Sequence, residues 1–401
     1  MGEKVMTGFP TRAEALANFF AAWEPQCGIE LVTLDEACGR VLAEDVESLV
    51  TVPVVRASSA DGIAVRSADF ANGLPDTSGW RLGREFVRAD TGDDFPDEYD
   101  AIIMIEKAAI QEDGSVVLDD DVQVSAGSGT MPAGATVSAG RPIMKAGRVI
   151  RPTDLAALCM GGHSAVKVRK RPVVAFIPTG SELVAYGTRP KRGQTIDANS
   201  LMCKNMLESY GARVIKFPIV RDDLEALEEA FTRALELADL VVVNGGSALG
   251  DEDFNVRMIE KRGRVVHHYI AAAPGRPLMM AVADGKPVVD LPGPPMAAYY
   301  GTDWCLQAIV CRMLGVPMPQ RQVVRAVSDA EYHAFGGFDM LGRWDVRREG
   351  EGLVAHPFNF RKGEQVDCLT SNAHRISPIG EWDVAPGDEI ELELLRGSEW
   401  L

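Results

Sequence analysis

Apolar runs and amphipathic helical segments alternate between residues 171 and 316, and this alternation constrains the fold more than any other feature of the chain. The apolar runs have the length of buried strands, and the segments between them carry apolar residues at helical spacing. Such alternation favours a parallel sheet with helices on both faces. The expected strands lie at 171–177, 213–220, 239–246, 264–272 and 286–293, and the expected helices at 200–212, 222–238, 254–263 and 295–314.

The rest of the chain has a different texture. Residues 11–23 show helical spacing behind a threonine N-cap, and a second helix is expected at 153–160. Short β-like runs between Gly, Pro and Asp turns predict a β-rich insertion, and the strand-rich end of the chain predicts a small β-barrel or sandwich. The expected domains are a discontinuous linker domain (1–48 and 138–170), the insertion (49–137), the α/β domain (171–316) and the C-terminal β domain (317–401).

The net charge of −17 argues against DNA or RNA as the main partner, although a local pocket can still bind a small anion. No run approaches the roughly 20 apolar residues that span a bilayer, and the first residues do not resemble a signal peptide. The seven cysteines are scattered and form no CxxC pair. We therefore expect neither a disulfide framework nor a structural zinc site. We therefore expect a cytoplasmic protein that binds neither nucleic acid nor a membrane.

Four polar loops follow the expected strands or open the expected helices of the α/β segment. They are Pro178–Leu183, Asp197–Ser200, the end of VVVNGGSALGDEDF at 241–254, and Leu291–Pro295. Ligands of open α/β sheets bind outside the carboxyl ends of the strands. We therefore expect the four loops to converge on one edge of the sheet, and this convergence is stronger evidence for a site than any single motif.

Each loop offers groups that suit an anion or a cation. Backbone N–H groups and hydroxyls of Thr179, Gly180 and Ser181 could cradle an anion, and the Glu182 carboxylate could hold a cation. Simple helix capping explains Thr179 or Ser181 about equally well, and capping is the favoured explanation for Asn199 and Ser200. Pro292 and Pro295 fix a rigid turn.

The third loop combines glycines with acids. Gly245, Gly246 and Gly250 permit a close approach of the backbone to a phosphate. Asp251, Glu252 and Asp253 would repel that phosphate unless a cation lay between them. A carboxylate beside a phosphate loop can hold Mg²⁺, so we predict this role for Asp253. A solvated helix start remains the simpler interpretation of Asp251 and Glu252.

Two polar turns precede the α/β segment. Asp61-Gly62 has the sequence of an ordinary hairpin turn, and Thr91-Gly92 that of an ordinary β-turn. Neither turn indicates a site by itself.

The order of these motifs resembles the molybdopterin molybdenumtransferase (MoeA) family, which includes the gephyrin E domain. The resemblance covers essentially the whole chain. The matching motifs are Asp-Gly-Ile-Ala-Val from Asp61, Thr91-Gly92, Pro-Thr-Gly-Ser-Glu-Leu from Pro178, Gly-Gly-Ser-x-x-Gly-x-x-Asp-Phe from Gly245, Pro-Gly-Arg-Pro from Pro274, and Leu-Pro-Gly-x-Pro from Leu291.

The resemblance implies a multidomain α/β plus β protein with a central molybdopterin-binding domain, in an elongated, L-shaped subunit. It implies a homodimer with the site at the subunit interface and 1–48 with 138–170 as the dimerisation domain. The implied activity is insertion of molybdate into molybdopterin, or adenylated molybdopterin, with cleavage of the adenylate and a divalent cation such as Mg²⁺. Implied protein partners are a molybdopterin adenylyltransferase and the molybdoenzyme apoproteins.

Site residues carry over motif by motif. Asp61, Glu182, Asp222 and Asp253 would be catalytic, and Asp61, Glu182 and Asp253 would bind the metal. The substrate-binding residues would be Thr91, Thr179, Gly180, Ser181, Gly245, Gly246, Ser247, Gly250, Pro274, Gly275, Arg276, Pro292, Gly293 and Pro295.

Several family residues are replaced in this chain. The Gly-Glu-Asp segment of the family aligns with Pro132–Thr136, and its Lys-Pro-Gly-Lys-Pro becomes Ala273–Pro277 with Arg276 as its one cation. Arg keeps the charge of Lys but changes the geometry of the contact. These replacements leave two alternatives open: a molybdopterin carrier without catalysis, and an insertase with altered specificity, for example for tungstate.

Overall fold

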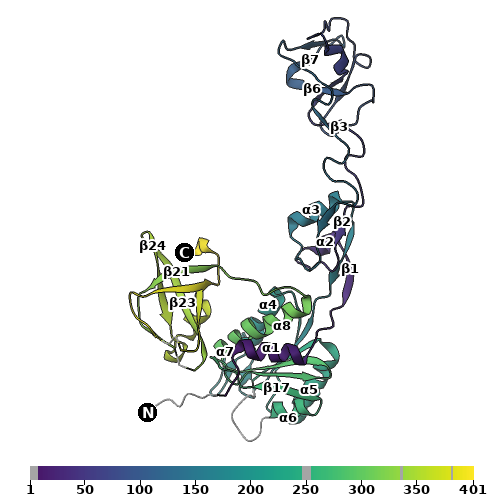
Figure 1. Cartoon of the computed structure of the whole chain (residues 1–401). Coiled ribbons are helices and arrows are strands. Elements are labelled where there is room, and N and C mark those ends of the chain that lie inside the picture. The colour runs from purple at the N-terminus through teal and green to yellow at the C-terminus, as the bar shows by residue number, and fades with distance from the viewer. Residues whose placement is uncertain (1–7, 246–253, 335–336, 381–382) are drawn as a thin grey trace. The chain divides into compact units, whose positions relative to one another are not determined.

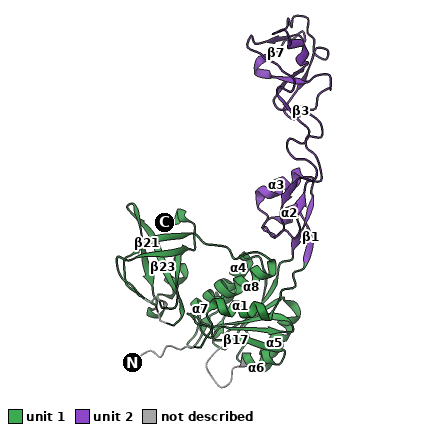
Figure 2. Ribbon diagram, in the orientation of Figure 1, with its two compact units in different colours: residues 1–28, 170–401 green, residues 29–169 purple. Residues whose placement is uncertain are grey.

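The protein is described by a computed structural model that covers residues 8–245, 254–334, 337–380 and 383–401 (Figure 1). Contacts divide the chain into two compact units (Figure 2). Unit 1 comprises residues 1–28 and 170–401, and unit 2 comprises residues 29–169. The four-domain division expected from the sequence stays a prediction, and each unit is described by itself below.

Unit 1 contains the expected α/β sheet, but the sheet is mixed. Four strands are parallel to one another, and the last two run antiparallel to their neighbours. The strand order is β15 (Arg213–Lys216), β12 (Val173–Pro178), β16 (Leu240–Asn244), β20 (Lys286–Leu291), β19 (Met279–Ala283) and β17 (Gly263–His268).

The purely parallel sheet predicted from the alternation is therefore wrong at this edge, and strand β19 was not expected at all. Only Asp284 and Gly285 separate β19 from β20, and both have positive φ, at 50° and 74°. A two-residue turn of this kind joins antiparallel strands, whereas a parallel pair needs a long crossover. The expected strand at 264–272 also ends early, because β17 stops at His268.

Helices cover both faces of this sheet, as the sequence predicted (Figure 1). On one face, Phe231 and Leu235 pack against Ile177 and Val243 in a fully apolar cluster. That face carries α5 (Leu224–Leu237) and α6 (Phe254–Glu260), and the other carries α1 (Arg12–Ala22), α4 (Asn199–Ser209), α7 (Pro295–Gly301) and α8 (Gln307–Leu314). The expected capping box at the start of α1 is present, because Thr11 and Glu14 bond each other reciprocally.

The single long helix expected at 295–314 is interrupted. A π turn, η3 (Thr302–Leu306), separates α7 from α8, and all five of its residues are buried. Within it, Asp303 pairs with Arg321 of the segment that leads into the C-terminal β domain. A π turn places one extra residue in the helix, which hydrophobic spacing alone does not reveal.

The C-terminal part of unit 1 is a closed barrel, which confirms the predicted β-barrel. Its strands pair in a ring because β23 bonds both β24 and β25. The ring runs β21 (Val323–Ser328), β24 (Gly352–Phe358), β23 (Asp339–Glu349), β25 (Ala373–Ser377) and β27 (Glu389–Leu394). Smaller elements of unit 1 are β13 (Leu183–Val184), β14 (Thr195–Ile196), β18 (Ala272–Ala273), β22 (Tyr332–His333), α9 (Gln365–Thr370) and β26 (Asp383–Val384).

Unit 2 holds the linker segment and the β-rich insertion. In the linker segment β1 (Ile29–Thr33) pairs with β11 (Ala165–Arg169) and β2 (Val46–Glu47) with β10 (Pro142–Met144), beside α2 (Leu34–Ala37) and α3 (Pro152–Met160). The insertion contains the sheet β5 (Phe86–Ala89), β4 (Gly62–Val65), β6 (Ala101–Met104), and the pairs β3 (Ala57–Ser58) with β9 (Thr130–Met131) and β7 (Ala108–Ile110) with β8 (Val116–Leu118). The β-rich insertion has a hydrophobic cluster of its own around Ile63, Trp80 and Phe86.

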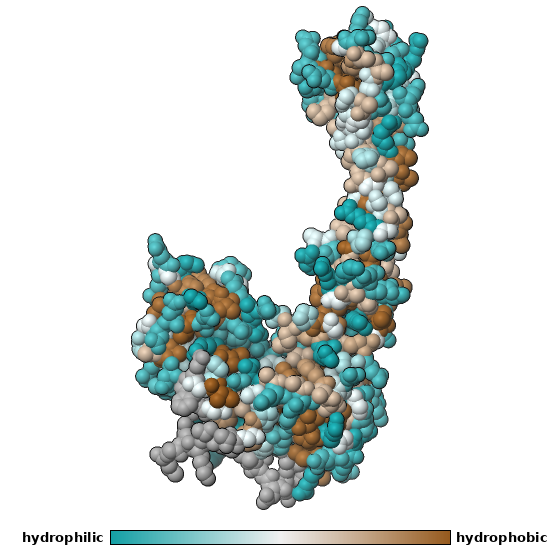
Figure 3. Space-filling model, in the orientation of Figure 1, coloured by the Kyte–Doolittle hydropathy of each residue, from teal (hydrophilic) through white to brown (hydrophobic). Residues whose placement is uncertain are grey.

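The face of the molecule seen in Figure 3 is mostly hydrophilic, with hydrophobic residues in patches on both units. Large apolar side chains are exposed on unit 2, among them Leu31 and Leu49, at 69% and 65%. Among the described residues, none of the helices has the length and hydropathy required to cross a bilayer.

Candidate substrate site at the carboxyl ends of the sheet

The order of the parallel strands reverses between β12 and β16. After β12 the chain adds β15 on one side, and then returns to add β16 and β20 on the other side. Such a switch point opens a crevice between the two loops that leave the neighbouring strands, and α/β proteins bind their ligands there. The loops after β12 and β16 are the first and third loops singled out in the sequence.

Backbone hydrogen bonds join these loops to each other and to the loop after β20. Thr179 N donates to Asn244 O at 2.9 Å, and Gly245 N donates to Leu291 O at 3.0 Å. The predicted convergence of these three loops on one sheet edge is therefore present in the structure.

Gly245 is required where the first and third loops meet. Its φ is +115°, and a Cβ added there would lie 2.4 Å from the Thr179 carbonyl oxygen. A side chain would have to displace backbone, which is costly in a region fixed on both sides. The glycine thus sets the spacing between the two loops.

Two asparagine side chains tie the fourth element, the start of α4, into the same edge. Asn199 Nδ2 donates to Asn244 Oδ1 at 3.0 Å and to Gly293 O at 2.7 Å. Asn244 Nδ2 in turn donates to the carbonyls of Leu291 and Pro292. One chain of amide groups therefore links α4 with the ends of β16 and β20.

The sequence-based explanation of Asn199 and Ser200 as helix N-caps is wrong. The N-cap position is Ala198, and the carboxylate of Asp197 accepts from both Ser200 N and Ser200 Oγ. The cap comes from Asp197, which frees Asn199 for its contacts with the neighbouring loops. Asn244, which closes the run VVVN, was also not predicted as a site residue. Its signal in the sequence is an amide at the end of a buried strand.

A second buried amide supports the same edge from α6. Asn255 Nδ2 donates to Gly245 O at 3.1 Å and to Asp290 Oδ2 at 2.8 Å. Asp290 is fully buried in β20 and Asn255 is 1% exposed. Buried polar groups persist where their hydrogen bonds are made, so this pair fixes the position of Gly245.

The predicted acid Asp222 contacts Ser181, the residue that precedes the other predicted acid, Glu182. Ser181 N donates to Asp222 Oδ2 at 2.9 Å, and Asp222 N donates to Ser181 Oγ at 3.1 Å. The Glu182 carboxylate folds back over Gly180, with Oε1 2.6 Å from the position of an added Cβ there. Ser181, Glu182 and Asp222 are all exposed, so these polar groups face solvent.

The same contacts limit what the first loop can offer to an anion. The backbone N–H groups of Thr179, Gly180 and Ser181 donate to Asn244 O, Val220 O and Asp222 Oδ2. These N–H groups are therefore already used within the protein. The Ser181 hydroxyl and the Glu182 carboxylate remain as the groups of this loop that can meet a ligand.

The predicted loop Pro274–Arg276 adjoins the start of α7. Gly275 has φ +112°, and an added Cβ would lie 3.6 Å from the Cβ of Ala297. Ala297 follows Pro295 in the first turn of α7. The structure therefore brings two of the predicted substrate segments, Pro274–Arg276 and Pro292–Pro295, close together.

Asp61 and Thr91 form a separate pair in unit 2. Asp61 Oδ1 accepts from both Thr91 N and Thr91 Oγ1, each at 2.7 Å. These hydrogen bonds hold the pKa of Asp61 below its usual value, and the bond from the Thr91 backbone N–H has the larger effect. Gly62 beside it allows the close approach of β6, because an added Cβ would lie 2.0 Å from Ile103 O. Two residues 30 positions apart in the sequence are thus one polar cluster, as the motif carry-over implied.

The remaining predicted residues, Gly246, Ser247, Gly250 and Asp253, lie outside the described part of the chain. Within the described part, three or more His, Cys, Asp or Glu side chains nowhere gather closely enough to hold a metal ion. The donors themselves fit Mg²⁺, because it binds carboxylate oxygens and Asp61 is held in its ionised form. A metal site built from Asp61, Glu182 and Asp253 stays a prediction.

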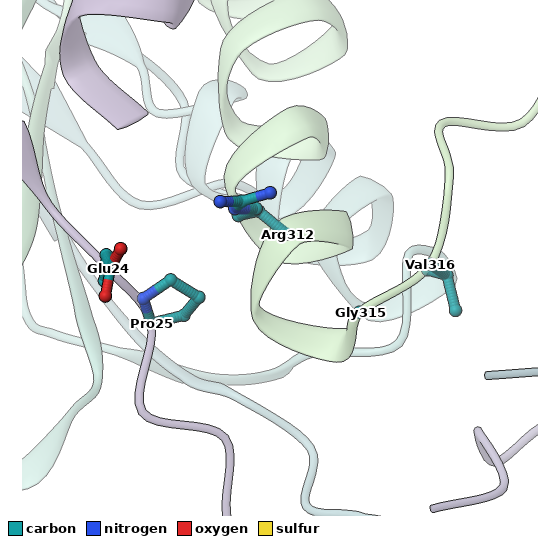
Figure 4. A pocket seen from close by; sticks show the side chains of 5 residues that line it. All are labelled: Glu24, Pro25, Arg312, Gly315 and Val316. Atoms are coloured by element: carbon teal, nitrogen blue, oxygen red, sulfur yellow. The ribbon is translucent and has the colours of Figure 1, made fainter. Parts of the chain in front are cut away.

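A cavity of about 510 Å³ lies elsewhere in unit 1, at the end of α8 (Figure 4). It is lined by Glu24, Pro25, Arg312, Gly315 and Val316. None of these residues belongs to the loops at the strand ends, and the Arg312 guanidinium lies over the ring of Phe20. The cavity is therefore no part of the candidate site.

Two family models match different parts of the chain. Residues 11–162 match the MoeA N-terminal region (domain I and II), and residues 175–310 match a probable molybdopterin binding domain. The molybdopterin molybdenumtransferase of Haemophilus influenzae is 30% identical over 298 residues, which are 71% of this chain and 73% of that protein. The Staphylococcus epidermidis protein of the same name is 26% identical over 92% of both chains.

Solved structures agree over the whole length. The molybdopterin biosynthesis MoeA protein from Pyrococcus horikosii superposes with a TM-score of 0.79 at 27% identity, covering 97% of this chain and 100% of that one. The fold defines a multidomain α/β protein with a β insertion and a C-terminal barrel, whose predicted site loops meet at the switch point of the sheet. The chain belongs to the molybdopterin molybdenumtransferase (MoeA) family.

Substitution of Gly245 by alanine tests the spacing of the two loops. We expect Gly245→Ala to push the first loop away and to destabilise this edge by about 1–3 kcal/mol, from the strained φ and the clash with Thr179. Amide hydrogen exchange of Ile177, Thr179 and Gly180 should become faster. The matched control is Gly293→Ala, because an added Cβ at Gly293 meets nothing within 4 Å. Equal exchange in the two variants would contradict this role of Gly245.

Removal of the Thr91 hydroxyl tests the polar pair in unit 2. We expect Thr91→Val to raise the pKa of Asp61 toward its usual value of 3.8. The recovery should be partial, since the backbone N–H of residue 91 is the larger cause and remains. Because the folded pKa is depressed, the pair stabilises its turn above that usual value and loses this contribution as the pH falls through the folded pKa. A carbon-detected NMR titration of the Asp61 carboxyl measures both effects, and an unchanged pKa would show that the hydroxyl has no influence.

Proposed function

We propose that this protein inserts molybdate into molybdopterin, and that it cleaves the adenylate when the pterin arrives in adenylated form. The observation that carries the proposal is the meeting of the family's loops at the switch point of the sheet, with Glu182 and Asp222 exposed beside Ser181. Family membership supports the same activity. In the chemical step, water adds to the phosphorus of the pyrophosphate link and the bond to AMP breaks. The dithiol then replaces one molybdate oxygen, which leaves as water.

The side chains of unit 1 have separable tasks in this proposal. The amide chain through Asn199 and Asn244 holds the crevice open at a fixed width. Glu182, whose carboxylate makes no hydrogen bond in the described structure, accepts a proton from the attacking water or binds the cation. Mg²⁺, held by Asp61, Glu182 and Asp253, would offset the negative charge of the phosphates. Asp61 and Thr91 would reach the site from a partner subunit.

A basic loop supports an anionic substrate in spite of the net charge of −17. Arg189, Lys191 and Arg192 lie between β13 and β14, and all three are exposed. Within the described residues, none of the three forms a salt bridge. Thr195 N donates to Glu182 O at 3.0 Å, which fixes the base of this loop to the candidate site. A cluster of unpaired cations beside the candidate site attracts a phosphorylated ligand by local field.

The decisive experiment incubates the purified protein with adenylated molybdopterin, molybdate and Mg²⁺. We expect AMP release together with a product that activates a molybdoenzyme apoprotein. Chelation of the divalent cation should stop AMP release, and added Mg²⁺ should restore it. Pterin binding without AMP release or cofactor formation would leave a carrier role instead and would contradict the proposed reaction.

Variants of the two exposed acids separate chemistry from positioning. We expect Glu182→Gln to lower kcat for AMP release by about 10²–10⁴, the range of a lost acid–base group. Asp222→Asn should keep most activity, since an amide oxygen can still accept a hydrogen bond from Ser181 N. Asp222→Ala should lose activity, because it removes this bond and the bond no longer holds the loop in place. Loss of activity in Asp222→Asn equal to that in Asp222→Ala would show that the charge of Asp222, not its hydrogen bond, matters.

The homodimer, the cytoplasmic location, and contact with a molybdopterin adenylyltransferase and apoproteins belong to the same proposal. Exposed Leu31 and Leu49 on unit 2 support an apolar interface. We expect Leu31→Asp with Leu49→Asp to shift a dimer toward monomer in analytical ultracentrifugation. The control is Leu74→Asp, at an exposed position of the insertion. A wild-type monomer, or a double variant that stays dimeric, would contradict this interface.

A further inference from the structure

One buried acceptor at the switch point has no donor. Asn199 is 7% exposed, and its Oδ1 atom is fully buried and without a hydrogen-bond partner. The orientation of the amide follows from its other contacts, because Nδ2 donates to two oxygens, Asn244 Oδ1 and Gly293 O. Exchanging the two ends would place oxygen against oxygen. The atom left over is therefore the acceptor.

Two neighbouring donors of the described residues are already used. Both hydrogen bonds of Asn244 Nδ2 go to the carbonyls of Leu291 and Pro292. The backbone N–H of Gly245 is used by Leu291 O. A buried acceptor that lacks a donor is costly, and a bound ligand is one way in which such a group is satisfied.

The surroundings indicate the chemistry of the missing donor. A carbonyl-type oxygen accepts N–H or O–H and repels phosphate and molybdate oxygens. The turn beside it, Pro292–Gly293–Pro294–Pro295, is rigid and carries no donor side chain. An amino group on a ring is a donor of this kind, and the prolines of the turn offer apolar surface beside the acceptor.

We infer that Asn199 is a substrate-binding residue whose Oδ1 accepts a hydrogen bond from the amino group of the substrate's heterocycle. The inference rests on the proposed function, because an adenylated pterin carries two such groups, one on adenine and one on the pterin. The shared chemistry is an exocyclic amino group on a planar ring. The same side chain positions the loops through Nδ2 and binds the ligand through Oδ1.

Paired ligands that differ only at the amino group distinguish the two sources. Isothermal calorimetry of the full-length protein compares AMP with purine riboside 5′-monophosphate, and pterin-6-carboxylate with 4-oxopteridine-6-carboxylate, which lacks only the 2-amino group. Loss of one buried hydrogen bond should weaken binding on the order of tenfold to a hundredfold in one of the two pairs. The pair that shows the loss identifies the ring that Asn199 contacts.

The same comparison on variants assigns the effect to Asn199. In Asn199→Ala both members of the sensitive pair should bind equally weakly. The control is Asn244→Ala, which breaks the amide bridge but keeps the Asn199 acceptor, and so should weaken both members while preserving their ratio. A ratio in Asn199→Ala that equals the wild-type ratio would overturn the inference.

The wild-type protein alone can also overturn the inference, so the test does not depend on whether a variant folds. Equal affinity within both pairs, or no binding of any of these ligands, would each do so. AMP release from the adenylated pterin is measured on the same preparation. Turnover without amino-group discrimination refutes the role of Asn199 only, whereas absent turnover refutes the proposed function.

Discussion

The candidate site depends on a short chain of side-chain amides at the carboxyl edge of the sheet. The bond from Asn199 Nδ2 to Asn244 Oδ1 joins the start of a helix to the end of the central strand β16. Hydrogen bonds are electrostatically stronger in a buried, low-dielectric position than in water, and a broken one leaves an expensive unpaired group. The loops therefore share one arrangement, and displacement of any of them costs the bonds of the others.

This arrangement also explains why Gly245 and the backbone bonds matter together. Thr179 lies so close to residue 245 that only glycine fits, and the Thr179 N–H is at the same time bonded to Asn244. Close approach and hydrogen bonding are two aspects of one contact between β12 and β16. The described parts of these loops are thus held in place by the protein itself, and a site that is fixed before a ligand binds limits the entropy lost on binding.

Much of the fold could be predicted from the sequence, and the failures have physical causes. Strands such as β12 and β16 are continuous apolar runs, and helix α5 has a clear apolar stripe, so local pattern and final structure agree. Strand β19 was missed because its identity depends on the turn at Asp284-Gly285. The π turn at 302–306 changes only the helix register, to which hydrophobic spacing is insensitive.

The site was harder to predict than the fold, because a motif specifies residue types and not the partner of each atom. Asn199 was interpreted as a cap from its position, but Asp197 performs that task and Asn199 reaches across two loops. The sequence suggests that the N–H groups of Thr179 and Ser181 bind an anion, but in the structure they donate to Asn244 O and Asp222 Oδ2. Tertiary contacts decide these assignments, and a single sequence does not contain them in readable form.

Charged groups and amides near the candidate site differ in burial. The buried amides are neutral and fixed, whereas Arg189, Lys191 and Arg192 are exposed and lie on a loop. Exposed charges act over about 8 Å at physiological salt and are screened beyond it, while a buried hydrogen bond is not. Attraction of the phosphorylated part of a substrate should therefore respond to salt, and recognition of its rings should not. The phosphates of an adenylated pterin would be attracted by exposed cations whose field is screened by salt. Its rings would be bound by hydrogen-bonding groups that the fold holds in place.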